Sequence, residues 1–127
     1  MEPSDQVNAL SRVVLEAALE VHRHLGPAFV ESVYENALCH ELLERSIRFA
    51  RQVAVDVHYK GRIVGEGRAD LIVDELVVVE LKAVPALAPV HVAQVISYLK
   101  ATSLTLGLLV NFGGRRLEDG FKRVILT

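Results

Sequence analysis

The sequence predicts an α/β (α+β) fold in which a mixed β-sheet is flanked by helices. Apolar residues recur at helical spacing near the N-terminus and again over residues 90–102, whereas the segments between and after them look like strands. Helices on both sides of a run of strands imply that they cover a sheet. Because the sequence has no repeat and no linker-like stretch, we expect a single domain over residues 1–127.

Two helices are expected before the first strand. Residues 6–25 place apolar side chains three and four positions apart, with Ser4 or Asp5 as the cap. Gly26-Pro27 is the signal that ends this helix. Residues 29–46 are predicted to form the second helix. Its apolar stripe consists of Val30, Val33, Tyr34, Ala37, Leu38 and Leu42.

The period then changes to that of strands. Residues 53–59 alternate apolar and polar side chains, which predicts a half-buried strand. Lys60-Gly61 is a turn signal, so a hairpin partner should begin at Arg62. The segment Gly65-Glu66-Gly67 is typical of a bulge or a bend in a strand. Two further strands are predicted over residues 68–73 and 76–83.

The C-terminal part of the chain combines one helix with two strands. Pro85 and Pro89 bracket a break, and residues 90–102 have helical spacing. Residues 104–112 form a nearly continuous apolar run, which predicts a central strand covered on both faces. After the turn at Gly113-Gly114, residues 121–126 can form a last strand. The expected order is therefore α-α-β-β-β-β-α-β-β.

Composition excludes several classes of protein. Because 51% of the residues are hydrophobic and 24% are charged, the chain is not intrinsically disordered. No run reaches the ~20 apolar residues that span a bilayer, and the polar, acidic N-terminus is unlike a secretory signal. Cys39 is the only cysteine, which excludes a disulfide framework and makes a cytoplasmic location the expectation. The net charge of −2 is unlike that of a protein that coats nucleic acid.

Three ionisable residues, Asp70, Glu80 and Lys82, interrupt the apolar strand segments. Glu80 and Lys82 point to the same side, because a strand alternates its faces. A two-residue loop at Asp74-Glu75 would pair Asp70 with Val79 instead of Glu80. A three-residue loop that also includes Leu76 would pair the two carboxylates, and we predict this register or a bulge of equal parity.

Two carboxylates in an apolar setting repel each other and lose hydration, and a divalent cation removes both problems. Carboxylate oxygens completed by water suit Mg²⁺ or Mn²⁺. Lys82 can orient or help to deprotonate an attacking water and can stabilise negative charge on a phosphate. The pattern thus predicts a site for metal-assisted hydrolysis.

The pattern Asp70…Glu80-Leu81-Lys82 resembles the D…ExK signature of the PD-(D/E)XK nuclease superfamily, with Ala69 in place of the usual proline. Residues 28–34 are similar to the motif of the GxxExxY protein family, a small branch of that superfamily. Glu31 and Tyr34 match this motif, and Ala28 stands in place of its first glycine. Further segments resemble the family in the same order, namely residues 20–22, 25–27, 91–94, 98–102 and 107–112.

This resemblance implies a restriction-endonuclease-like fold with an αβββαβ core and an extra N-terminal helix. It implies that Asp70 and Glu80 are the main metal ligands, Lys82 the catalytic lysine, and Glu31 a further acid that can also bind the metal. Four more residues are implied as substrate contacts or as supports of the site: Gln94, Tyr98, Tyr34 and Arg68. Gln94 and Tyr98, four residues apart, share one helix face.

Each of these residues also has a purely structural interpretation. Glu31 can simply favour the helix dipole at its position near a helix start. Glu80 and Lys82 can form a charged ladder on an exposed face, and Tyr34 can be a core aromatic residue. Gln94 and Tyr98 can cap the sheet. His91 is a weaker candidate for substrate contact. The basic runs, Arg45, Arg48 and Arg51 in one segment and Arg115, Arg116, Lys122 and Arg123 in the other, suit either a phosphate path or a solvated surface.

The leading functional hypothesis is a Mg²⁺- or Mn²⁺-dependent nuclease that acts on DNA or, as the second choice, on RNA. The alternative is a non-catalytic module that keeps the fold and binds nucleic acid or a protein. A purely structural domain leaves the ionisable set unexplained. Residues 104–111 and the terminal strand offer an edge through which a homodimer could form.

Overall fold

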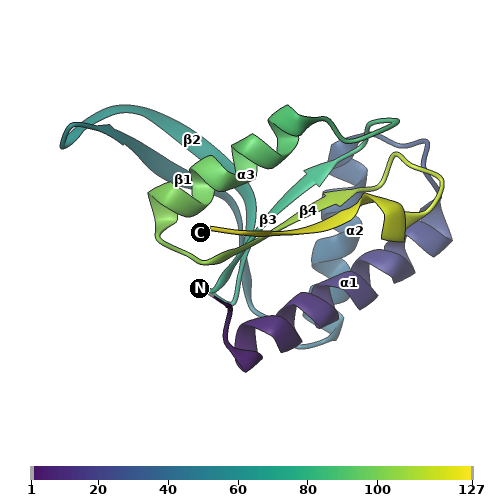
Figure 1. The fold of residues 1–127 in the computed structure, drawn as a ribbon. Coiled ribbons are helices and arrows are strands. Elements are labelled where there is room, and N and C mark those ends of the chain that lie inside the picture. The colour runs from purple at the N-terminus through teal and green to yellow at the C-terminus, as the bar shows by residue number, and fades with distance from the viewer. Residues whose placement is uncertain (1, 127) are drawn as a thin grey trace.

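The computed structural model describes residues 2–126, which build a five-stranded mixed sheet with the strand order β1-β2-β3-β4-β5. The elements follow one another as α1 (Asp5–Leu25), α2 (Glu31–Glu44), β1 (Phe49–Tyr59), β2 (Arg62–Val73), β3 (Val77–Lys82), α3 (Pro89–Thr102), β4 (Leu106–Asn111), the short 3-10 helix η1 (Leu117–Gly120) and β5 (Phe121–Ile125). Helices α1 and α2 cover one face of the sheet and α3 covers the other (Figure 1). Among these residues, no helix is both long and apolar enough to cross a membrane.

Helix α1 confirms the predicted element and decides between its two candidate caps. The Ser4 hydroxyl accepts a hydrogen bond from the backbone N–H of Val7 at 3.2 Å, while Asp5 lies in the first turn. Gly26 ends the helix with a φ of 71°, a left-handed conformation that glycine adopts without steric cost.

Helix α2 is shorter than predicted at both ends. It begins at Glu31, and Val30, which was expected in the apolar stripe, is 68% exposed. The cause is the hydroxyl of Tyr34, which donates to the carbonyl of Gly26 and accepts from the N–H of Phe29, so that the preceding residues form a loop. At the other end, the positive φ of Ser46 stops the helix.

Strand β2 is continuous, so the prediction of separate strands on either side of Gly65–Gly67 is wrong. Only three strands therefore lie between α2 and α3, in agreement with the αβββαβ core. The predicted irregularity is present as a shift in the register between β1 and β2, which leaves Val64 as an extra residue. The pairing with β1 continues on both sides of this shift.

The β1–β2 hairpin extends beyond the rest of the sheet (Figure 1). The prediction that the apolar side of residues 53–59 is buried therefore holds only near the body of the protein. Val55 is buried beneath α3, whereas Val57 is 43% and Tyr59 61% exposed. Alternation identified the face correctly, but no element covers its outer part.

Strand β4 is the central strand that its apolar run predicts. It pairs in parallel with β3 and antiparallel with β5, and all six of its residues are buried. Since β4 has a neighbour on both sides, it cannot provide the edge that was expected for a homodimer. The edges of the sheet are β1 and β5.

Candidate functional site

The turn between β2 and β3 sets the register of the two central carboxylates. Leu71 pairs with Val79 and Val73 with Val77, so the loop consists of three residues and places Asp70 opposite Glu80. Asp74 and Glu75 both have a positive φ, and the N–H of Leu76 donates to the carbonyl of Val73 at 3.0 Å. The predicted three-residue register is confirmed.

Asp70 and Glu80 lie where β2 and β3 cease to pair with each other, and their side chains bridge the two strands. The backbone N–H of Asp70 donates to Oε1 of Glu80 at 2.9 Å. In return, the N–H of Leu81 donates to Oδ2 of Asp70 at 2.8 Å. The two carboxylates thus replace the backbone acceptors that the next step of the β2–β3 ladder would supply. Both N–H groups therefore keep a hydrogen-bond partner although the strands separate.

Burial makes the negative charge of this pair costly. Glu80 is only 2% exposed, and its burial together with the neighbouring Asp70 carboxylate raises its pKa to about 8. Burial also raises the pKa of Asp70, although its hydrogen bonds from Leu81 and Gln52 oppose that shift. A positive charge placed between the two carboxylates would relieve this repulsion.

Glu31 and Lys82 complete a group of charges around the pair. Partial burial raises the pKa of the Glu31 carboxyl; the Lys82 ammonium lowers it and the Asp70 carboxylate raises it. The same lysine also lowers the pKa of Glu80. Helix α2, through its first residue, and the end of β3 therefore bring Glu31 and Lys82 within electrostatic reach of Asp70 and Glu80.

A second layer of polar residues, which sequence reasoning missed, holds Asp70 from the side of β1. Gln52 donates to Oδ1 of Asp70 at 3.3 Å and to Oε1 of Glu35 at 2.7 Å. Arg51 binds the other oxygen of Glu35 through two nitrogens, at 2.9 and 3.1 Å. The available signal was the spacing of Glu31 and Glu35, which places both acids on one face of α2.

His91 also acts on Glu31, since its charge lowers the pKa of that carboxyl. Its Nδ1 accepts a hydrogen bond from the N–H of Ala88 at 2.9 Å, which fixes the ring at the start of α3. His91, the weaker candidate for substrate contact, therefore lies beside the acidic group.

Tyr34 does not reach the surface of the site. It is fully buried and its ring stacks on Phe112, with the ring centroids 4.6 Å apart. Its hydroxyl is occupied by the loop between α1 and α2. Tyr34 can therefore act on the site only by holding the loop that leads to Glu31.

The other predicted substrate contacts lie on α3 and β2. Nε2 of Gln94 is 3.5 Å from the hydroxyl of Tyr98, which confirms that they share a face of α3. The ring of Tyr98 packs over the backbone of Gly67 in β2, and Arg68 is exposed on the same strand. Within residues 2–126, no hydrogen bond joins Gln94, Tyr98 or Arg68 to Asp70, Glu80 or Lys82.

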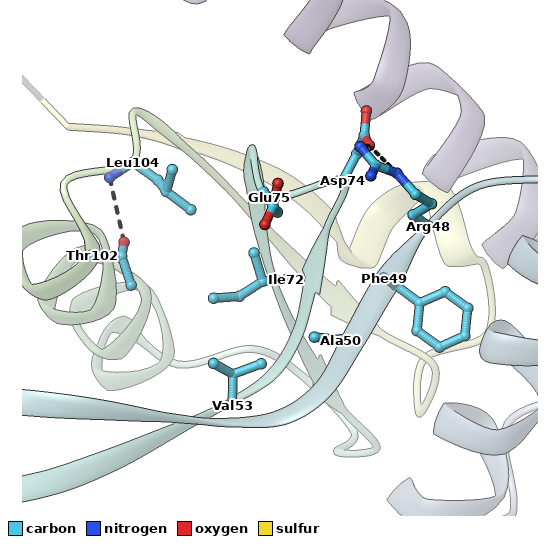
Figure 2. A pocket seen from close by; sticks show the side chains of 9 residues that line it. All are labelled: Arg48, Phe49, Ala50, Val53, Ile72, Asp74, Glu75, Thr102 and Leu104. Carbon is cyan, nitrogen blue, oxygen red and sulfur yellow. Dashed lines mark hydrogen bonds and ion pairs between the residues drawn. The ribbon is translucent and has the colours of Figure 1, made fainter.

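A separate cleft of about 500 Å³ lies at the opposite end of α3. Figure 2 shows the ion pair of Arg48 with Asp74 at one end and Thr102 with Leu104 at the other. Between them the lining is mostly apolar, and the cleft contains none of the predicted site residues. This cleft therefore does not coincide with the candidate site.

The basic run at Arg45, Arg48 and Arg51 does not form a free phosphate path. The three guanidinium groups bind Glu41, Asp74 and Glu35, respectively. This finding favours the solvated-surface interpretation for the first two arginines, while Arg51 supports Glu35 beside the site.

Comparison with known proteins agrees with the fold. A family model described as the PD-(D/E)XK nuclease superfamily matches residues 8–124. Neither curated proteins nor solved structures gave a match. The mixed sheet flanked by helices is consistent with the predicted restriction-endonuclease-like fold. Because the family match reaches from α1 to β5, the chain belongs to the PD-(D/E)XK nuclease superfamily.

Proposed function

We propose that this protein hydrolyses phosphodiester bonds in nucleic acid, with DNA as the favoured substrate, at the site of Asp70, Glu80, Lys82 and Glu31. One observation carries the proposal: the two central carboxylates meet at the point where β2 and β3 separate, and Lys82 follows on the same strand. Ionisable groups that a fold retains at such a cost are typical of a functional site.

The donor set suits Mg²⁺ or Mn²⁺, because Asp70, Glu80 and Glu31 offer only carboxylate oxygens. Burial raises the pKa of all three carboxyls, so a bound cation would favour their ionised forms. Within residues 2–126, no three acidic, histidine or cysteine side chains already form a ready-made ligand set. Asp70 and Glu80 would therefore hold the ion first, with Glu31 and water as further ligands.

The charges of the site define the task of each residue. A bound divalent ion would supply Lewis acidity and would lower the pKa of a coordinated water. When all three acids are ionised, they outnumber the one ammonium and repel a phosphate, so a cation must neutralise them before the substrate can approach. The Nζ of Lys82 would orient the attacking water and stabilise the negative charge that develops on the phosphate.

The loop before α2 supports assignment to the GxxExxY branch. The Tyr34 hydroxyl fixes this loop, and Glu31 then begins α2 at a position where the Lys82 charge acts on it. Ala28 does not have a positive φ, so alanine fits the backbone where the motif usually has glycine. The two residues of the motif that this chain retains thus have coupled tasks, one as a support and the other as an acid.

The test is cleavage of single- and double-stranded DNA and RNA in the presence of Mg²⁺ or Mn²⁺. Asp70→Asn and Lys82→Met should each reduce the cleavage rate by about 10²-fold or more. Asp74→Asn is the matched control, since it removes a carboxylate from the same hairpin outside the site and should leave the rate unchanged. Equal rates for the wild type, Asp70→Asn and Lys82→Met would reject the proposal.

Calorimetry provides a measurement of metal binding that does not depend on turnover. Wild-type protein and Asp74→Asn should bind Mn²⁺, and Glu80→Gln should bind it much more weakly, because a ligand and a negative charge are lost. Equal affinity in all three proteins would place the metal elsewhere.

A non-catalytic binding module is the second candidate function, and the hydrogen bonds of the carboxylates favour it. Asp70 and Glu80 already accept bonds from backbone N–H groups, so the pair can serve as a purely structural clasp. Tight binding of nucleic acid without cleavage, unaffected by Mn²⁺, would support this function and reject the nuclease.

A further inference from the structure

The outer part of the β1–β2 hairpin, residues 56–66, forms an arm. Every residue of the arm is exposed. Of the eight large apolar side chains exposed within residues 2–126, four belong to it: Val57, Tyr59, Ile63 and Val64. A two-stranded hairpin is marginally stable in water on its own, and a cluster of exposed apolar side chains is typical of an interaction site.

The free edge of the arm is regular and unprotected. β1 is an edge strand of the sheet. Its left-handed residues, Gln52 and Lys60, lie on either side of residues 53–59, which are extended. The extra residue Val64 lies in β2, away from this edge. The edge therefore lacks the prolines and bulges that usually prevent another strand from pairing.

The charge of the arm indicates what kind of partner it fits. Lys60 and Arg62 are balanced by Asp56 and Glu66, so the arm has no net charge when His58 is neutral. Binding along a phosphate backbone relies on an excess of positive charge. A balanced, apolar edge fits the strand of another protein better than it fits nucleic acid.

We propose that β1 pairs antiparallel with β1 of a second copy of this chain, in a register centred on Val57. In this register, Val57 meets Val57 of the second copy, and Tyr59 lies opposite Val55. Asp56 then faces His58, whose imidazole N–H can donate to a carboxylate. A register centred on Asp56 would instead oppose two aspartates, and like charges at directly opposed positions are unfavourable.

Pairing in this register would also cover the apolar face of the arm. Val55 lies in the apolar cluster under α3, and Val57 and Tyr59 share its face because side chains alternate along a strand. Directly opposed residues of antiparallel strands point to the same face. The joined hairpins would form a four-stranded sheet with the α3 helices of both copies on one side and the exposed valines and tyrosines between them.

The first experiment measures the mass of the protein by sedimentation over a range of concentrations. We expect a monomer–dimer equilibrium in the wild type and at least about tenfold weaker association for Val57→Lys, which places two ammonium groups opposite each other. Ile63→Lys is the matched control, because it adds the same charge to the arm on the strand away from the paired edge. A wild-type protein that stays monomeric, or equal weakening by both variants, overturns the proposal.

The second experiment tests the register and does not depend on the effect of a lysine on folding. Oxidised Val57→Cys should form a disulfide-linked dimer, whereas Ile63→Cys should remain largely monomeric under the same conditions. The natural Cys39 is buried, so wild-type protein is the background. His58→Asp should weaken the dimer, and combining it with Asp56→His should restore association. A failed rescue, or equal crosslinking at residues 57 and 63, rejects this register.

Nucleic-acid binding serves as the competing outcome. The proposal does not depend on nuclease activity, so a duplex that the protein does not cleave can be used as the probe. If Val57→Lys and wild type are both monomeric and Val57→Lys binds the duplex more weakly despite its added positive charge, the arm is a nucleic-acid contact and the dimer proposal is rejected.

Discussion

The two halves of strand β2 both contain large apolar residues but have opposite environments. In the inner half, Leu71 and Val73 are fully buried, whereas in the outer half Ile63 and Val64 are exposed. The inner half lies between β1 and β3 and beneath helices, while the outer half pairs with β1 alone. The apolar pattern of a strand thus identifies a face, but the neighbouring layers decide whether that face is buried.

Asp70 marks the boundary between these halves. Beyond this residue, β2 no longer has β3 as a neighbour, and carboxylates satisfy the N–H groups of Asp70 and Leu81. The same side chains are the proposed metal ligands. The end of the pairing between β2 and β3 leaves N–H groups that need acceptors, and the carboxylates that accept from them form the buried acidic site.

The largest expected effect compares large-to-small substitutions in the two halves. Leu71→Ala should reduce the free energy of unfolding by ~2–5 kcal/mol, because it leaves a cavity in the core. Ile63→Ala in the arm should change it by no more than ~0.5 kcal/mol. Urea denaturation at a low protein concentration, where association is weak, measures both. Similar losses would show that the arm is as well packed as the body.

The next largest effect is on the pH dependence of stability, through Glu80 at the boundary that Asp70 marks. The pKa of Glu80 is about 8 in the fold, compared with an ordinary value of 4.5, so the folded protein binds this proton more tightly than the unfolded chain. Stability should therefore fall as the pH rises from about 4.5 to about 8. Without metal, Glu80→Gln should have little effect below this range and should stabilise the fold above it, on the order of 1–3 kcal/mol.

Thermal unfolding of the metal-free protein between pH 4.5 and 9 measures this difference. Glu75→Gln is the control, because it removes an exposed carboxylate from the adjacent turn. An equal gain in stability in Glu75→Gln would mean that the effect comes from the overall charge of the protein. A pH-independent gain in Glu80→Gln would contradict the assigned ionisation of Glu80.

The smallest effect tests where the body ends and the arm begins. A Cβ on Gly67 would lie 2.8 Å from Cε1 of Tyr98, whereas a Cβ on Gly65 would have nothing within 4 Å. Gly67→Ala should therefore destabilise the fold by ~1–2 kcal/mol, and Gly65→Ala should be neutral within ~0.5 kcal/mol. Denaturation midpoints compare them, and equal effects would mean that α3 does not support the hairpin at Gly67.

Much of the fold followed from local patterns. The helix at the N-terminus, the Lys60-Gly61 turn and the buried strand β4 were predicted from periodicity and turn residues. Strand parity left two registers open for Asp70, and the structure has the predicted three-residue loop that places it opposite Glu80. The division of β2 was wrong because glycines weaken a strand locally, while the pairing with β1 on either side maintains it.

Parts of the candidate site could not be predicted in the same way. Gln52 joins Asp70 to Glu35 only because β1 lies beside β2 and the Glu35 side chain of α2 reaches Gln52, and none of these distances is present in the sequence. The same holds for Tyr34, whose hydroxyl holds a loop instead of a substrate. A residue type defines which bonds are available, but its partners depend on how the elements pack.

The sequence by itself determined the periodicity of the elements, the common face of Glu80 and Lys82, and the residue types suited to a divalent metal. Only the tertiary structure decided that Glu80 is buried, that Glu31 and Lys82 act on the same carboxylates, and that the arm stays uncovered. The physical reason is that bonding capacity and local geometry belong to the residue and its near neighbours. Burial and electrostatic coupling depend instead on segments that are distant along the chain.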